Sequence, residues 1–78
     1  MNLTVRYGDD SLTILEMYNN SRYEVAHWTE DEIDADPAVA QLADNAAQMA
    51  QENPRKLIKR LYGSVEAWER ERRNRRWD

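Results

Sequence analysis

Among the side chains that can catalyse a reaction or bind a ligand, carboxylates are the most numerous in this sequence. The 78 residues hold 15 Asp and Glu, 11 Lys and Arg, one histidine and no cysteine. Five of the acids fall between Glu30 and Asp36, and two more are adjacent at Asp9 and Asp10. Paired carboxylates serve in general acid–base catalysis and in binding divalent cations, so we consider these two uses first.

A cation site does not fit the acidic run. A calcium loop needs oxygen ligands at alternate positions, a glycine at its sharp turn and a distal glutamate. Ile33 and Ala35 do alternate with acids here, but the glycine is missing and Pro37 follows. Helix capping explains most of these acids without any ligand, so we expect no metal.

Catalysis is poorly supported by the remaining residue types. His27 is the lone histidine, and no serine lies in a pattern that would make it a nucleophile. Gly8 and Gly63 are the two glycines, too few for a phosphate-binding loop. A chain this short seldom builds a cleft that desolvates a carboxylate. We therefore predict a protein that is not an enzyme and that uses no cofactor.

The elements that must position the acids begin with three strands. Alternating apolar residues predict strands at residues 3–7, 12–18 and 22–28, with turns at Gly8-Asp9-Asp10 and Asn19-Asn20-Ser21. Residues 12–18 carry apolar side chains on both faces, which is typical of a central strand. Short connections favour an antiparallel meander.

Helix signals start at Thr29. Thr29 and Glu32 fit a capping box, and Asp36-Pro37 forms a second, stronger helix start. Asn53-Pro54 ends one helix and caps the next, unless Pro54 kinks one long helix. Gly63 ends that helix, and Ser64 can cap a last one.

The apolar pattern of the helical part predicts which residues are buried. Within the helix after Pro37, four residues recur at spacings of three and four and form its expected apolar stripe: Val39, Leu42, Ala46 and Met49. Trp28 and Trp68 are expected in the core, and Trp77 outside it. The fold class predicted is α+β: a three-stranded antiparallel β-meander followed by two or three α-helices packed on one face. Residues 1–78 form a single domain, with 1–28 as the sheet part and 29–78 as the helical part.

Charge is divided unevenly along the chain. Residues 1–53 hold two positive and eleven negative side chains, a net charge of −9, and residues 54–78 hold nine positive and four negative, a net charge of +5. Such asymmetry indicates an interaction surface, or two halves that attract each other within one fold.

An acidic surface with tyrosines nearby is the first candidate interaction site. Its carboxylates would mimic the phosphates of a nucleic acid and occupy a basic groove on a larger protein. The chain has four tyrosines, three tryptophans and no phenylalanine, a mixture favoured at interfaces. The predicted partner-binding residues are Asp9, Asp10, Glu30, Asp31, Glu32 and Asp34, with the aromatic residues Tyr7, Tyr18 and Tyr23.

The C-terminal arginines are the second candidate. The run Arg72-Arg73-Asn74-Arg75-Arg76-Trp77 resembles the arginine-rich helices of viral RNA-binding proteins, and this resemblance implies contacts to RNA or DNA. The sequence departs from that motif because three glutamates are spaced to pair with arginines: Glu66–Arg70, Glu69–Arg73 and Glu71–Arg75. An alternative interpretation is therefore a solvent-exposed helix that these ion pairs stabilise, without any nucleic-acid partner. The nucleic-acid-binding residues of this alternative are Lys56, Lys59, Arg60, Arg72, Arg73, Arg75 and Arg76.

In size and composition the chain resembles the small acidic proteins of phages and mobile elements, among them the anti-CRISPR inhibitors. This resemblance implies a non-enzymatic module that blocks a nucleic-acid-handling host protein, or a larger nucleoprotein complex, through its acidic face. We expect a monomer or homodimer. The absence of cysteine, of a long apolar leader and of an apolar run near the ~20 residues of a membrane span favours a cytoplasmic location, in the host cell if the protein is phage-encoded. The alternatives are direct RNA or DNA binding and a self-associating structural protein.

Overall fold

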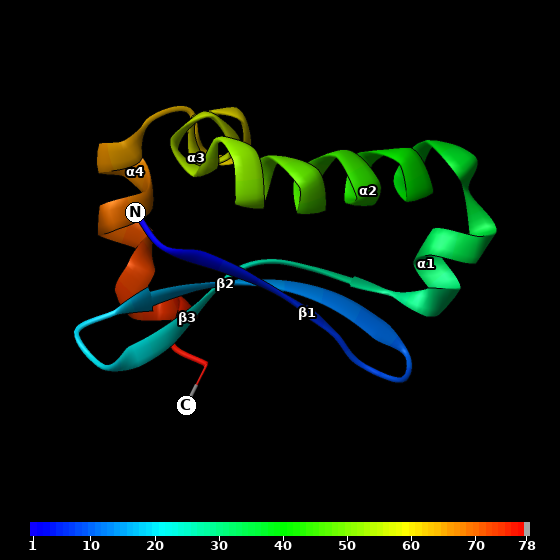
Figure 1. Cartoon of the computed structure of the whole chain (residues 1–78), viewed down its shortest axis with the longest axis horizontal. Coiled ribbons are helices and arrows are strands. Elements are labelled where there is room, and N and C mark those ends of the chain that lie inside the picture. Colours follow the sequence, from blue (N-terminus) through cyan, green and yellow to red (C-terminus); the bar gives the residue numbers. More distant parts are fainter. Residues whose placement is uncertain (78) are drawn as a thin grey trace.

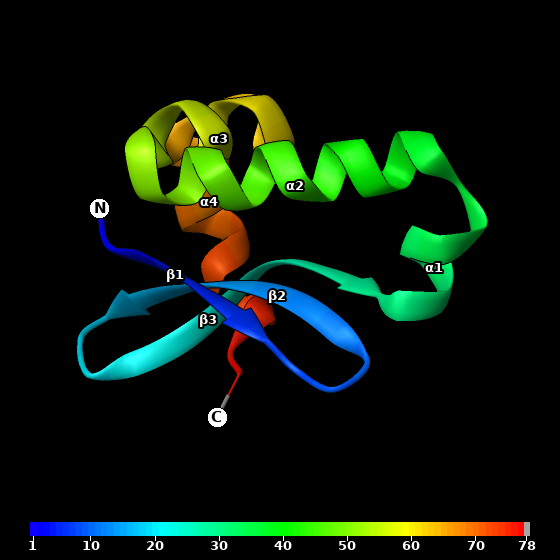
Figure 2. The same cartoon turned by 45° about the vertical axis from the view of Figure 1, so that its right-hand side comes forward.

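The computed structural model describes residues 1–77, which form one three-stranded sheet and four α-helices. The strands are β1 (Leu3–Tyr7), β2 (Ser11–Tyr18) and β3 (Ser21–Thr29). The helices are α1 (Glu30–Ala35), α2 (Pro37–Glu52), α3 (Pro54–Tyr62) and α4 (Val65–Glu71), followed by the 3-10 turn η1 (Arg72–Arg75). Figures 1 and 2 show α2 and α3 over one face of the sheet, with α4 beside it at the end opposite α1. The predicted α+β class is confirmed.

The sheet is the predicted antiparallel meander, in the order β1-β2-β3. Central β2 has buried side chains on both faces, as its pattern predicted. Asn19 and Asn20 have φ angles of 51° and 64°, the left-handed pair that a two-residue hairpin turn requires. The register between β2 and β3 shifts between Ile14 and Leu15, so one extra residue of β3 bulges there.

Four helices form where two or three were expected, because a separate helix begins at each of the capping residues that the sequence predicted. Thr29 and Glu32 make both hydrogen bonds of the capping box. Asp36 has an extended backbone (φ −144°, ψ 114°), so it separates α1 from α2, and its carboxylate accepts a hydrogen bond from the Ala38 amide at 2.9 Å. Asn53 and Ser64 cap α3 and α4 in the same way. Gly63, with φ at 92°, ends α3.

The core lies between the helices and the sheet. Its largest fully buried side chains are Trp68, Ile14, Leu57 and Ile58. Trp28 is half-buried and packs against the core, so the expectation for both tryptophans holds.

A hydrogen bond connects α3 to β3: the Tyr62 hydroxyl donates to the Val25 carbonyl at 2.6 Å. Burial raises the pKa of the Tyr62 phenol.

The buried face of α2 differs from the expected stripe. Four alanines pack towards the sheet, namely Ala43, Ala46, Ala47 and Ala50, while Leu42 is 49 % exposed. Small side chains let the helix approach closely, and each residue is rotated by about 100° from the next. Leu42 is therefore turned away from the sheet, towards the neighbouring α3, where it lines a hollow with Leu57 and Leu61.

Candidate functional site

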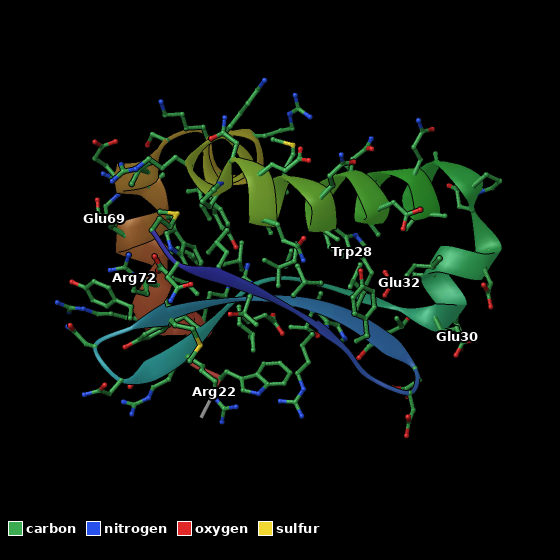
Figure 3. All side chains as sticks on the ribbon, viewed as in Figure 1. Arg22, Trp28, Glu30, Glu32, Glu69 and Arg72 are labelled. Carbon is green, nitrogen blue, oxygen red and sulfur yellow. The ribbon has the colours of Figure 1, made fainter. Side chains whose placement is uncertain are left out.

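Six predicted carboxylates gather at one end of the molecule, where the β1–β2 turn meets α1. The Glu30 amide donates to the Asp10 carbonyl at 2.7 Å and joins the two segments. All six residues are exposed, and Figure 3 shows Glu30 and Glu32 at this end, far from Arg72. Within residues 1–77, no cation lies within ion-pair distance of them. We call this group the acidic end: Asp9, Asp10, Glu30, Asp31, Glu32 and Asp34.

Glu32 is the one member of the acidic end with a clear second role. Its carboxylate accepts hydrogen bonds from the Thr29 amide at 3.1 Å and from the Thr29 hydroxyl at 3.0 Å. The amide hydrogen bond, with a smaller contribution from the hydroxyl, lowers the pKa of Glu32 because both bonds favour the charged form. Glu32 therefore stabilises the start of α1 and presents its charge in a fixed position.

A notch of about 180 Å³ adjoins the acidic end. Leu12 and Ile33 contribute apolar surface to it, and Asp44 of α2 adds a carboxylate that is not among the predicted partner-binding residues. Tyr7 also lines the notch and is 75 % exposed. Asp44 comes near because α2 packs over β1, and no sequence spacing signals that contact.

The three candidate tyrosines are separated. Tyr7 is beside the acidic end, whereas Tyr18 and Tyr23 flank the β2–β3 turn at the other end of the hairpin. Their rings meet edge to face with centroids 6.5 Å apart. Only Tyr7 is therefore placed to act together with the acidic end.

The opposite end of the molecule contains a buried charge cluster that the sequence did not predict. Glu16, which is 3 % exposed, accepts on one oxygen both the Trp68 indole N–H and the Arg72 Nε, each at 2.8 Å. The Arg72 guanidinium also lies 3.8 Å from the centre of the Tyr18 ring. A buried carboxylate is costly unless it is paired, and here both partners come from the C-terminal part of the chain. We call Glu16, Tyr18, Trp68 and Arg72 the clasp.

The chain after the clasp runs along the free edge of β3. Arg76 forms an antiparallel bridge with Tyr23, and the Trp77 amide donates to the Arg22 carbonyl at 2.8 Å. Arg75 lies 3.7 Å from Glu24 and 3.4 Å from Glu71. Arg22 lies on the sheet face away from the helices (Figure 3). The antiparallel pairing of Arg76 with Tyr23 sets Trp77 opposite Arg22, and directly opposite residues share one face of a sheet. Trp77 is 38 % exposed, in keeping with its expected place outside the core.

These contacts divide the predicted nucleic-acid-binding residues. Arg72 and Arg75 are engaged with carboxylates of the protein itself, whereas Lys56, Lys59, Arg60, Arg73 and Arg76 are exposed and have no ion pair within residues 1–77. Of the three expected glutamate–arginine pairs, Glu71–Arg75 forms. The other two do not come within 4.0 Å in residues 1–77. Arg73 of the Glu69–Arg73 pair lies in the 3-10 turn, where the α-helical spacing of side chains no longer holds.

Glu16 had a signal in the sequence. It is an acid between the apolar residues Leu15 and Met17 in a strand predicted to be central. Such a position predicts a buried carboxylate that needs a donor. Which donor it finds depends on residues more than 50 positions away, in the last helix.

We next consider the histidine and the carboxylates as possible catalytic or metal-binding groups. His27 is exposed, and its Nδ1 is 2.8 Å from the Thr13 hydroxyl. Among residues 1–77 no three His, Asp or Glu side chains are grouped so as to hold a metal ion. No helix in this range is long and apolar enough to cross a membrane.

The fold and the charge arrangement define a small α+β domain with an exposed acidic end and, in the clasp, a buried carboxylate that is paired. No family model, curated protein or solved structure matches the chain.

Proposed function

We propose that this protein is a non-enzymatic module whose acidic end docks on a basic surface of a larger protein that handles nucleic acid. By occupying that surface it would exclude the phosphate backbone, in the manner of the small acidic inhibitors of phages and mobile elements. The observation that supports this most is the gathering of six exposed carboxylates with no cation beside them in residues 1–77.

Local rigidity favours such binding. The Asp10–Glu30 hydrogen bond joins the turn to α1, and the Thr29 capping box holds Glu32. Charges that are already positioned lose little conformational entropy when they bind, so more of the electrostatic attraction appears as affinity. Tyr7 and the notch add apolar surface that a partner can bury.

Direct nucleic-acid binding by the arginine-rich segment is the less favoured function. Arg72 and Arg75 already pair with Glu16 and Glu24, and the whole chain carries a net charge of −4. A phosphate backbone would have to compete with these carboxylates for the same guanidinium groups.

Affinity capture from a nuclease-treated lysate, followed by mass spectrometry, tests the proposal. We expect a basic nucleic-acid-handling protein to be retained, to be released by added salt and to be displaced by duplex DNA. A partner that binds the protein and DNA simultaneously would contradict phosphate mimicry.

A charge-reversed variant shows whether the acidic end makes the contact. Asp9→Lys, Asp10→Lys and Asp34→Lys together should weaken capture of that partner by at least about a hundredfold, since each reversal places like charges together. The matched control reverses three exposed acids elsewhere, Glu52, Glu66 and Glu69, with the same change in net charge. Equal loss in both variants would mean that net charge alone governs binding.

A further inference from the structure

A groove between α2 and α3 has exposed apolar surface that the proposed function leaves unused. Leu42 is 49 % exposed, although its spacing is that of a core residue. It lines a hollow of about 140 Å³ together with Met49 and Leu61. This hollow shares the lining residues Met49 and Arg60 with a second one of about 560 Å³, so the two lie side by side, and we call them together the groove.

The polar rim of the groove is positive. Lys56 and Arg60 line it, and neither has a carboxylate within 4.0 Å in residues 1–77. The Arg60 guanidinium donates to the Met49 sulfur at 3.5 Å, and a thioether is a weak acceptor. Among residues 1–77, Glu52 is the one acid lining the groove, and its carboxylate accepts a hydrogen bond from Gln48 at 3.3 Å.

We propose that this groove binds an acidic amphipathic helix of a partner protein. Leucine-type side chains of that helix would cover Leu42, Met49 and Leu61, and its carboxylates would pair with Lys56 and Arg60. Leu42 and Met49 are seven residues apart on α2, a distance of about 10 Å along the axis, which two to three turns of a docked helix would cover. Met49 can adapt to different apolar shapes because its side chain is flexible and polarisable.

The combination of an aliphatic floor and a positively charged rim favours an acidic amphipathic helix over other partners. A nucleic acid would use the two cations but leave the aliphatic floor exposed to water. The acidic segment of a second copy is α1, whose six residues carry one large apolar side chain, Ile33, which is half-buried in its own fold. An acidic helix of another protein fits both the floor and the rim. The groove thus gives the protein a second docking surface, independent of the acidic end.

Methyl-detected NMR on the whole protein tests the site. The probe is a synthetic helical peptide with leucines at i, i+3, i+4 and i+7 and glutamates at most other positions. We expect saturable shifts of the Leu42, Met49 and Leu61 methyl groups. A peptide of the same composition with scrambled leucines, and a DNA duplex of the same charge, should not produce them. Equal binding of either control would overturn the proposal, and so would the same shifts on raising protein concentration alone, which would identify a second copy as the occupant.

Adjacent positions on α3 provide a matched control. Lys56→Glu with Arg60→Glu should weaken binding of the peptide by at least about tenfold, because both cations at the rim become repulsive. Arg55→Glu with Lys59→Glu makes the same change in charge on the side of α3 that faces a separate groove beside α4, and should change affinity by less than about threefold. Leu42→Ser, at an exposed position that the fold does not need, should also weaken binding about tenfold. Equal loss in the two charge variants, or full binding by Leu42→Ser, would overturn the proposal.

Discussion

The acidic end and the clasp differ in how their charged side chains are exposed and paired. Carboxylates of the acidic end are exposed and have no cationic partner in residues 1–77, whereas Glu16 of the clasp is 3 % exposed and bonded to both Trp68 and Arg72. The acids that pair with the arginine-rich segment include Glu16 and Glu24 from the negative half of the chain. Attraction between the two halves of the chain therefore stabilises the fold. From composition alone, the arginines and glutamates of these pairs would be assigned to an interaction surface.

This contrast predicts different consequences of mutation at the two ends. A charge in the clasp stabilises the fold, and its loss should be measured as a lower free energy of unfolding. A charge at the acidic end should change unfolding little and partner binding much.

The largest expected effect is that of Arg72→Ala. The substitution removes the guanidinium that donates to Glu16 and lies over the Tyr18 ring. The Glu16 carboxylate then stays buried and keeps the hydrogen bond from the Trp68 indole. We expect the free energy of unfolding to fall by about 3 kcal/mol in urea titrations. Arg73→Ala in the same turn, where the side chain is exposed and has no ion pair within residues 1–77, should change it by less than about 0.5 kcal/mol. Similar values for the two variants would refute the clasp.

Thr29→Ala should have an intermediate effect. The substitution removes the hydroxyl that accepts from the Glu32 amide at 3.2 Å, one of the two hydrogen bonds of the capping box. A loss of about 1 kcal/mol is expected in thermal or urea unfolding. If α1 also holds the acidic end in place, amide exchange should accelerate in α1 and at the β1–β2 turn more than in α3, and uniform acceleration would contradict this local role.

The smallest effect concerns pH and Glu32. Its pKa is lowered in the folded protein, so its contribution to stability is present above the ordinary glutamate pKa and is lost as pH falls through the folded value. Glu32→Gln should therefore be slightly less stable than the parent at neutral pH, and the difference should shrink at about pH 3. Direct titration of the Glu32 carboxyl by NMR measures the shift, and a pKa at or above the ordinary glutamate value would be inconsistent with the capping box.

The sequence by itself determined most of the local structure. Strand alternation, the Asn19-Asn20 turn and each helix cap follow from forces between residues close in the chain, such as side-chain hydrogen bonds to neighbouring amides. The acidic end was also predictable as a set, because four of its six members lie in one short segment and the other two in one turn.

Tertiary structure alone decided which side chains meet across long distances. Leu42 became exposed because the alanines of α2 pack closer to the sheet, and Asp44 joined the notch because α2 lies over β1. Arg72 became a structural residue because Glu16 is buried beneath it and needs a donor. The physical reason is common to these cases: burial and pairing depend on how whole elements pack, and residue spacing along one element does not encode the position of its neighbours.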